Sequence, residues 1–162
     1  MINIVTLKDI YKAVCDHIAS ATNIQLADSD QEEPVIRPSF KVFMDTVNSG
    51  LYSSGLRSIK TYFNIYFYAT NKKQCKSEIY EIEDMLAFSF LVPLRIKDTC
   101  AVFVDNLKFE KVDDGILNIS FDFEIGTEFI DESSIEPMEE LRINEKLEEW
   151  LNGNKTNYWN WF

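Results

Sequence analysis

The stretch VDDGILNISFDFEI, residues 112–125, joins a turn signal to a regular alternation of apolar and polar side chains. The pair Asp114-Gly115 is typical of a tight β-hairpin turn. In the residues that follow, the apolar positions are Leu117, Ile119, Phe121, Phe123 and Ile125, and the polar positions are Asn118, Ser120, Asp122 and Glu124. This period of two predicts an antiparallel strand with one face in a core and a polar face opposite.

A second alternating stretch, RSIKTYFNIYFYAT at residues 57–70, is the strongest strand pattern in the chain. Its inward positions are predicted to be Ile59, Thr61, Phe63, Ile65 and Phe67. Its outward positions are predicted to be Lys60, Tyr62, Asn64, Tyr66 and Tyr68. If this strand aligns with the first, the tyrosines and the polar positions of residues 118–124 share one partly open face of the sheet.

The remaining strands are predicted from shorter patterns. Residues 40–44 alternate as a strand should, and the prolines at positions 34 and 38 confine its start to the edge of a sheet. Residues 100–111 are predicted to form one strand with a bulge near Asp105 and Asn106, because the apolar phase changes there. Residues 46–57, TVNSGLYSSGLR, are predicted to form a long mobile loop that orders on docking.

Two helices are predicted. The first begins at Thr6, which stands three residues before Asp9 as in a capping box, and it carries one apolar face. The second is predicted to begin at Asn71, with Gln74 in the reciprocal capping position, and to end before Pro93. Its buried stripe is predicted to be Cys75, Ile79, Ile82, Met85 and Leu86.

These elements predict a two-layer α+β domain over residues 1–130, in the order α-β-β-α-β-β, with the helices on one face of an antiparallel sheet. Residues 131–162 are predicted to form a separate C-terminal helical extension of the domain, made of a linker, a short acidic helix and the aromatic tail NKTNYWNWF. This second region carries eight acidic and three basic residues.

The net charge of −11 argues against a protein that binds nucleic acid by neutralising phosphates, so no specific nucleic-acid binding is expected. The sequence has no run of about 18 apolar residues, so no membrane span is expected. Its start lacks the pattern of a secretion signal. Three widely spaced cysteines suggest neither a zinc site nor a disulfide framework, and reduced cytoplasmic thiols are the simplest interpretation.

Candidate catalytic residues are few. His17 is the only histidine, and a solvated or packed surface residue is the favoured interpretation over a general base. Glu81, Glu83 and Asp84 could hold Mg²⁺, but a solvated helix face accounts for them. Neither a phosphate-binding loop nor a nucleophile elbow is present. We therefore expect a protein that is not an enzyme, with no cofactor and no catalytic or metal-binding residue; a small acidic metal-dependent hydrolase is the alternative.

The outward tyrosines could stack the bases of a single strand, but the acidic surroundings favour burial against another protein. The predicted interface residues are Leu51, Tyr52, Leu56, Arg57, Lys60, Tyr62, Tyr66 and Tyr68. A second set, Trp150, Tyr158, Trp159, Trp161 and Phe162, is predicted to dock on a neighbouring molecule. The alternative for this aromatic tail is that it folds back and fills a gap beside its own sheet.

Four segments together resemble the tail terminator, or tail completion, family of phages of Gram-positive hosts and related phage tail-like particles. They are the capped helix TLKDIYKAVCDHI, the motif Arg37-Pro38-Ser39-Phe40, the strand RSIKTYFNIYFY, and the final hairpin VDDGILNISFDFEI. The hairpin has one aspartate more than the family pattern V-D-G-x-L-x-F. The resemblance covers residues 1 to about 130, and residues 131–162 are an addition to it.

The resemblance implies a structural protein that forms a homo-oligomeric ring, most often a hexamer, on the end of the tail tube. Such a ring stops tube growth and docks the next component, so the implied partners are the tube protein and a sheath or neck protein. It implies assembly in the cytoplasm of the bacterial host and then a place in a phage, or in a headless contractile bacteriocin (tailocin). A head–tail connector of the neck is the alternative within the same structural class.

Overall fold

A computed structural model describes residues 4–27, 30, 35–53 and 55–128. Its helices are α1, Leu7–Thr22, and α2, Lys76–Ser89. Its strands are β1 Ser39–Ser53, β2 Leu56–Tyr68, β3 Leu94–Lys97, β4 Cys100–Val102, β5 Lys108–Asp113 and β6 Ile116–Glu128. The acidic helix and aromatic tail predicted within residues 131–162, and the domain division near residue 130, lie outside the described residues.

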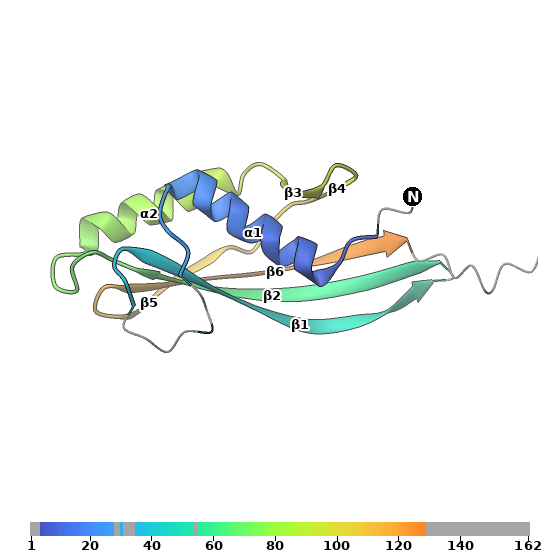
Figure 1. Cartoon of the computed structure of the whole chain (residues 1–162), viewed down its shortest axis with the longest axis horizontal. Helices are drawn as coiled ribbons and strands as arrows, with labels where there is room; N and C mark the ends of the chain where they lie inside the picture. Colours follow the sequence, from blue (N-terminus) through green and yellow to red (C-terminus); the bar gives the residue numbers. More distant parts are fainter. Residues whose placement is uncertain (1–3, 28–29, 31–34, 54, 129–162) are drawn as a thin grey trace, which may run out of the picture. The chain divides into compact units, whose positions relative to one another are not determined.

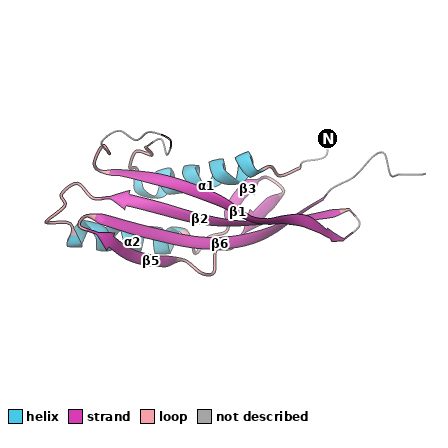
Figure 2. Cartoon of the chain, turned by 90° about the horizontal axis from the view of Figure 1, so that it is seen from below, coloured by secondary structure: helices cyan, strands magenta, loops and turns pink. Residues whose placement is uncertain are grey.

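β1, β2, β6 and β5 form, in that order, one antiparallel sheet, and β3 pairs with β4 in a separate two-stranded sheet. Both helices lie on one face of the four-stranded sheet (Figure 1), and the view from below shows the opposite face free of the described helices (Figure 2). β1 is an edge strand, which suits the proline at its entrance because proline cannot donate to a neighbouring strand. The predicted two-layer α+β fold is therefore confirmed.

The core lies between this sheet and the two helices. β2 and β6 pair without a register shift, so Phe63 lies opposite Phe121, and their rings stack with centroids 5.2 Å apart. Every predicted inward position of both strands is buried. The helices add Ile10, Val14 and Ile18 from α1 and Ile79, Ile82 and Leu86 from α2. These residues are the main source of stability, since burying one such side chain contributes about 1.5–3 kcal/mol.

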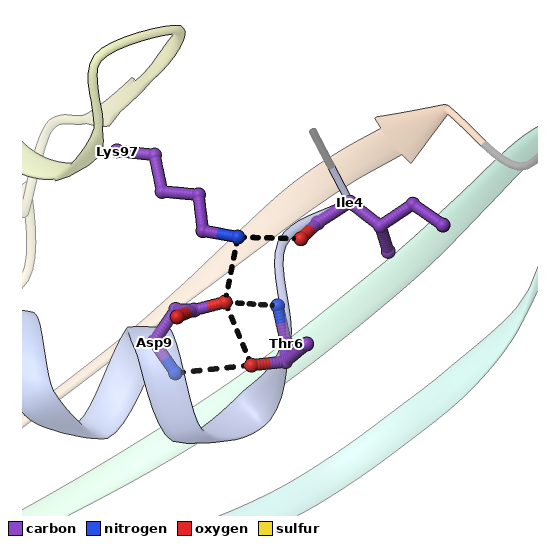
Figure 3. A network of polar contacts seen from close by, with 4 residues as sticks. All are labelled: Ile4, Thr6, Asp9 and Lys97. Carbon is purple, nitrogen blue, oxygen red and sulfur yellow. Dashed lines mark hydrogen bonds and ion pairs between the residues drawn. The ribbon is translucent and has the colours of Figure 1, made fainter. Parts of the chain in front are cut away.

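The first turn of α1 is tied to the β3–β4 hairpin. Thr6 and Asp9 form the predicted capping box: the Asp9 N–H donates to Thr6 Oγ1 over 3.2 Å, and the Thr6 N–H donates to Asp9 Oδ2 over 2.9 Å. Lys97 Nζ lies 2.9 Å from Asp9 Oδ2 and donates to the Ile4 carbonyl over 2.7 Å (Figure 3). The Thr6 side chain, followed by its backbone N–H and by Lys97, lowers the pKa of Asp9 from 3.8 to about 2.

Arg37 joins three segments that are distant in the sequence. Its Nη1 donates to the carbonyl of Ala69 over 2.9 Å and to that of Gly115 over 3.2 Å, and its guanidinium lies 5.5 Å from the centroid of the Tyr68 ring. Gly115 has a φ of +70°, and a Cβ there would lie 2.9 Å from the Cα of Lys72. The Arg-Pro-Ser-Phe and Asp-Gly motifs are therefore physically linked, because one arginine holds the entrance of β1 against the β5–β6 turn.

α2 begins later than predicted. Its N-cap is Cys75, whose side chain makes no capping hydrogen bond, and Asn71 Oδ1 instead accepts from the N–H of Lys73 over 2.9 Å. The predicted Asn71 cap with Gln74 is therefore wrong, because Asn71 stabilises a turn before the helix. Met85, predicted to be buried, is 39% exposed, since the inner face of α2 follows the other four predicted positions.

Residues 100–111 form two strands rather than one bulged strand. β4 pairs with β3, β5 pairs with β6, and residues 103–107 cross from one sheet to the other. The phase change near Asp105 and Asn106 marks this crossing, so the predicted bulge is wrong. The short strand β3, which lies just after Pro93, is not predicted by any periodicity in the sequence.

Residues 46–57 do not form the predicted loop. β1 continues to Ser53 and β2 starts at Leu56, so two long strands meet at a short turn. β6 stays paired with β2 as far as Glu128. The ends of these three strands reach beyond the helices in Figure 1. We call residues 46–53, 56–60 and 124–128 the extension; Ile59, Ile125 and Thr127 at its base are still buried. Pairing on both sides of β2 outweighs the low strand propensity of the glycines and serines here.

Candidate assembly interface

The open face of the sheet carries the outward residues of β2 and β6 side by side. The paired positions are Lys60–Glu124, Tyr62–Asp122, Asn64–Ser120 and Tyr66–Asn118. These residues are partly or fully exposed, whereas the residues that alternate with them are buried. The predicted alignment of the tyrosines with the polar positions of β6 is confirmed.

Charges of both signs are interleaved on this open face. Lys60 Nζ lies 3.5 Å from Asp122 Oδ2, and Asn106 Nδ2 donates to the other oxygen of the same carboxylate. By register, Lys41 of β1 and Lys108 of β5 belong to the same face. Interleaved charges suit a complementary protein surface, whereas nucleic acid requires a continuous basic one.

Aromatic rings are grouped on the open face near β1. Phe43 meets Tyr66 edge to face with ring centroids 5.8 Å apart, and Phe43 is 39% exposed. Tyr68 lies against the Arg37 guanidinium. Half-exposed rings with polar tips are typical of protein interfaces. Phe43 and Lys41 are absent from the predicted interface set, although the alternation of residues 40–44 could have placed them there.

The extension carries the most exposed of the predicted apolar residues. Leu51 is 71% exposed and Tyr52 is 78% exposed, while Leu56 is 38% exposed. Since paired residues of antiparallel strands share a face, Leu51 and its partner Arg57 point to the same side as the core residues of β2. Arg57 is held there by two hydrogen bonds, from Nε and Nη2 to Ser49 Oγ, over 3.1 and 2.8 Å.

The predicted interface residues therefore do not form one surface. Lys60 and the three tyrosines of β2 lie on the open face, whereas Leu51 and Arg57 lie on the opposite face of the extension. The sequence-based grouping fails because residues 46–53 continue as a strand, which assigns each side chain to one face. Trp150, Tyr158, Trp159, Trp161 and Phe162 lie outside the described residues.

A groove of about 500 Å³ lies between α1 and the segment 92–96. His17 lines it, half-buried, with its ring centroid 4.6 Å from that of Phe90. Burial is the main influence on this histidine and lowers its pKa, while a hydrogen bond to the Ser89 backbone acts in the opposite direction. This is the packed histidine that the sequence favours. Ser20 also lines the groove, but its hydroxyl donates to the backbone carbonyls of Asp16 and His17 rather than to the imidazole.

Within the described ranges, no three His, Cys, Asp or Glu side chains come together in a way that could hold a metal ion. Neither α1 nor α2, the helices of the described chain, has the length and apolar character that crossing a membrane requires. The described surface offers contact area, in the form of an open sheet face and an extension with exposed apolar side chains.

A family model described as phage tail terminator protein matches residues 9–136, which include both helices and all strands except the first two residues of α1. The chain belongs to the phage tail terminator family. The terminator therefore has a structural role in tail completion, as part of the virion and in contact with other tail components. No curated protein matches the chain.

Proposed function

We propose that this terminator forms a closed ring, most often a hexamer in the family it resembles, that caps the end of the tail tube. The ring stops the addition of further tube subunits and gives the neck or sheath a platform. In a closed ring every subunit buries the same exposed surface against a neighbour, whereas in an open arrangement the end subunits leave theirs exposed. Family membership supports the tail-completion part of this proposal.

The observation that carries the ring and cap is the extension. Three paired strands leave the helical layer, and the tip of β1 and β2 exposes Leu51 and Tyr52 by more than two thirds. Large apolar side chains gain free energy on leaving water, and their strands are already paired, so docking orders little additional backbone. The extension is therefore proposed to contact the tube or the next subunit.

The open face is proposed as the second contact between subunits. Tyr62, Tyr66 and Phe43 supply apolar area there, and the paired charges of Lys60 and Asp122 set the register of the partner. The net charge of −11 further supports a channel that repels the DNA backbone and lets it pass. Residues 150–162 are proposed to bind a neighbouring subunit or the outer layer of the tail once the ring has formed.

The test uses purified protein with purified tail tubes and, separately, with the portal end of the head. The proposal predicts that the protein binds tube ends, that light scattering shows a closed oligomer either alone or with tubes, and that capped tubes no longer elongate. Binding to the portal end alone would instead identify a neck component. A protein that stays monomeric at high concentration, both alone and with tubes, would contradict the ring.

A further inference from the structure

The outer side of α2 carries large exposed side chains together with acidic ones. Tyr80, Asp84 and Phe88 follow one another at spacings of four residues, which makes them neighbours along one stripe of the helix. The stripe lies opposite the three residues that α2 buries in the core, and Tyr80 and Phe88 are 63% and 71% exposed. Leu91 is 72% exposed, and its N–H donates to the carbonyl of Phe88 over 3.2 Å. We call Tyr80, Glu81, Asp84, Phe88 and Leu91 the α2 surface.

The two acids of the α2 surface are available to a partner. Glu81 stands three residues before Asp84, so their carboxylates are neighbours, and both residues are exposed. Glu81 accepts a hydrogen bond from the Ser77 hydroxyl over 3.4 Å. Neither acid forms an ion pair with a basic residue of the described chain. Exposed rings beside such carboxylates fit a protein surface that presents an apolar side chain next to a cation.

The tip of the extension presents this combination. Leu51 is 71% exposed, and its paired residue Arg57 points to the same side of the strands. The Nε and Nη2 atoms of Arg57 both donate to Ser49 Oγ, which holds the guanidinium in place. Arg57 Nη1 has no hydrogen-bond partner among the described residues. The Nη1–Nη2 edge therefore remains open to a carboxylate, which a guanidinium binds through two parallel hydrogen bonds.

We propose that in the assembled ring the tip of one subunit docks on the α2 surface of the next copy of this chain. Arg57 of the first subunit pairs with Asp84 of the second, and Leu51 packs against Phe88. This inference rests on the proposed ring, and it names the surface that receives the extension. Apolar contact supplies affinity there, and the charge pair sets the register.

This contact joins separate subunits. The extension belongs to the four-stranded sheet, and α2 packs on one face of that sheet through its buried side (Figure 1). The α2 surface therefore points away from the sheet and from the extension of its own subunit. A contact between two different surfaces of identical chains is heterologous, and it generates a ring when the rotation between neighbours closes. Each subunit then uses its tip once and its α2 surface once.

Charge reversal on either side of the contact provides the test. Arg57→Glu places a carboxylate opposite Asp84, and Asp84→Arg places a second guanidinium opposite Arg57. Each variant alone should raise the concentration needed for assembly about tenfold or more. An equal mixture of the two variants should assemble like the unmutated protein. In the mixture, alternating subunits around an even-numbered ring pair every tip with an α2 surface of opposite charge. Light scattering, with and without tail tubes, measures the assembly.

The matched controls are Lys8→Glu and Asp98→Arg, which make the same charge changes at exposed positions on α1 and in the β3–β4 turn. They should leave assembly unchanged. Phe88→Ser should weaken assembly without lowering the melting temperature, which tests the contact independently of the folding of Arg57→Glu. Melting curves verify that each variant is folded.

The outcomes separate this contact from the ring itself. Single charge reversals that assemble like the unmutated protein, or a mixture that stays unassembled, would overturn the contact and leave the ring in place. An unmutated protein that is monomeric with and without tubes would contradict the proposed function, and the contact with it.

Discussion

The two ends of the same three strands, β1, β2 and β6, have opposite environments. Under the helices, inward residues such as Phe63 and Ile65 are completely buried. In the extension, which continues the same pairing, Leu51 and Tyr52 are mostly exposed. At the base of the extension Ile59 and Ile125 are still buried, so only its tip, at residues 51 and 52, lies outside the core. One sheet thus joins a half with completely buried inward side chains to a tip whose apolar side chains are exposed, and the proposed function assigns contact with other tail components to that tip.

The largest difference between the two halves is expected for truncation of core aromatic residues. Phe63→Ala removes a ring stacked against both Phe121 and Phe123, and it should lower the free energy of unfolding by about 3–5 kcal/mol. Tyr52→Ala in the extension should change it by less than about 0.5 kcal/mol, because the side chain is 78% exposed. Urea unfolding of both variants measures the difference. Similar losses would mean that the extension belongs to the core.

Two glycines allow a second test of the same contrast. Gly115→Ala places a Cβ 2.9 Å from a backbone carbon at a φ of +70°, and it should destabilise the fold by about 1–3 kcal/mol. Gly126→Ala in the extension meets nothing within 4 Å and should be close to neutral. Thermal melts of both variants provide the comparison. An unchanged melting temperature for Gly115→Ala would show that the β5–β6 turn, which Arg37 contacts, accommodates the added methyl group.

The sequence predicts the helix-covered half well because its signals are periodic. Alternation in residues 57–70 and 112–125 assigns every buried position of β2 and all those of β6 except Thr127, and the Thr6–Asp9 spacing locates the start of α1. The start of α2 is mispredicted because an asparagine side chain accepts a backbone hydrogen bond in a turn just as it does at a helix N-cap, so the sequence does not distinguish the two. β3 is missed because a four-residue strand has too few residues for a period.

The extension is mispredicted as a loop for a related reason. Its glycines and serines have low strand propensity, and only pairing with β2 and β6, which no local pattern reveals, makes residues 46–53 a strand. Leu51 and Tyr52 are nevertheless identified as contact residues, because their apolar character does not depend on the conformation around them.

A smaller effect is expected from the polar network at the start of α1, in the helix-covered half. The pKa of Asp9 is depressed from 3.8 to about 2, so its stabilising effect is fully present above pH 3.8 and is lost as the pH falls toward 2. Asp9→Asn should therefore show less loss of stability across this pH window than the unmutated protein. Acid titration of the melting temperature measures this, with Asp98→Asn, which changes an exposed carboxylate in the turn between β3 and β4, as the control. If the melting temperatures of Asp9→Asn and the unmutated protein fall equally on acidification, ionised Asp9 does not stabilise the fold as described.

The most direct test of the separation between stability and assembly uses the double variant Leu51→Ser, Tyr52→Ser. Its melting temperature should match that of the unmutated protein, because both side chains are already exposed. Under the proposed capping role, tube lengths measured by electron microscopy in its presence should be unlimited, since the apolar tip of the extension is lost. Tubes of normal, defined length with this folded variant would contradict the account.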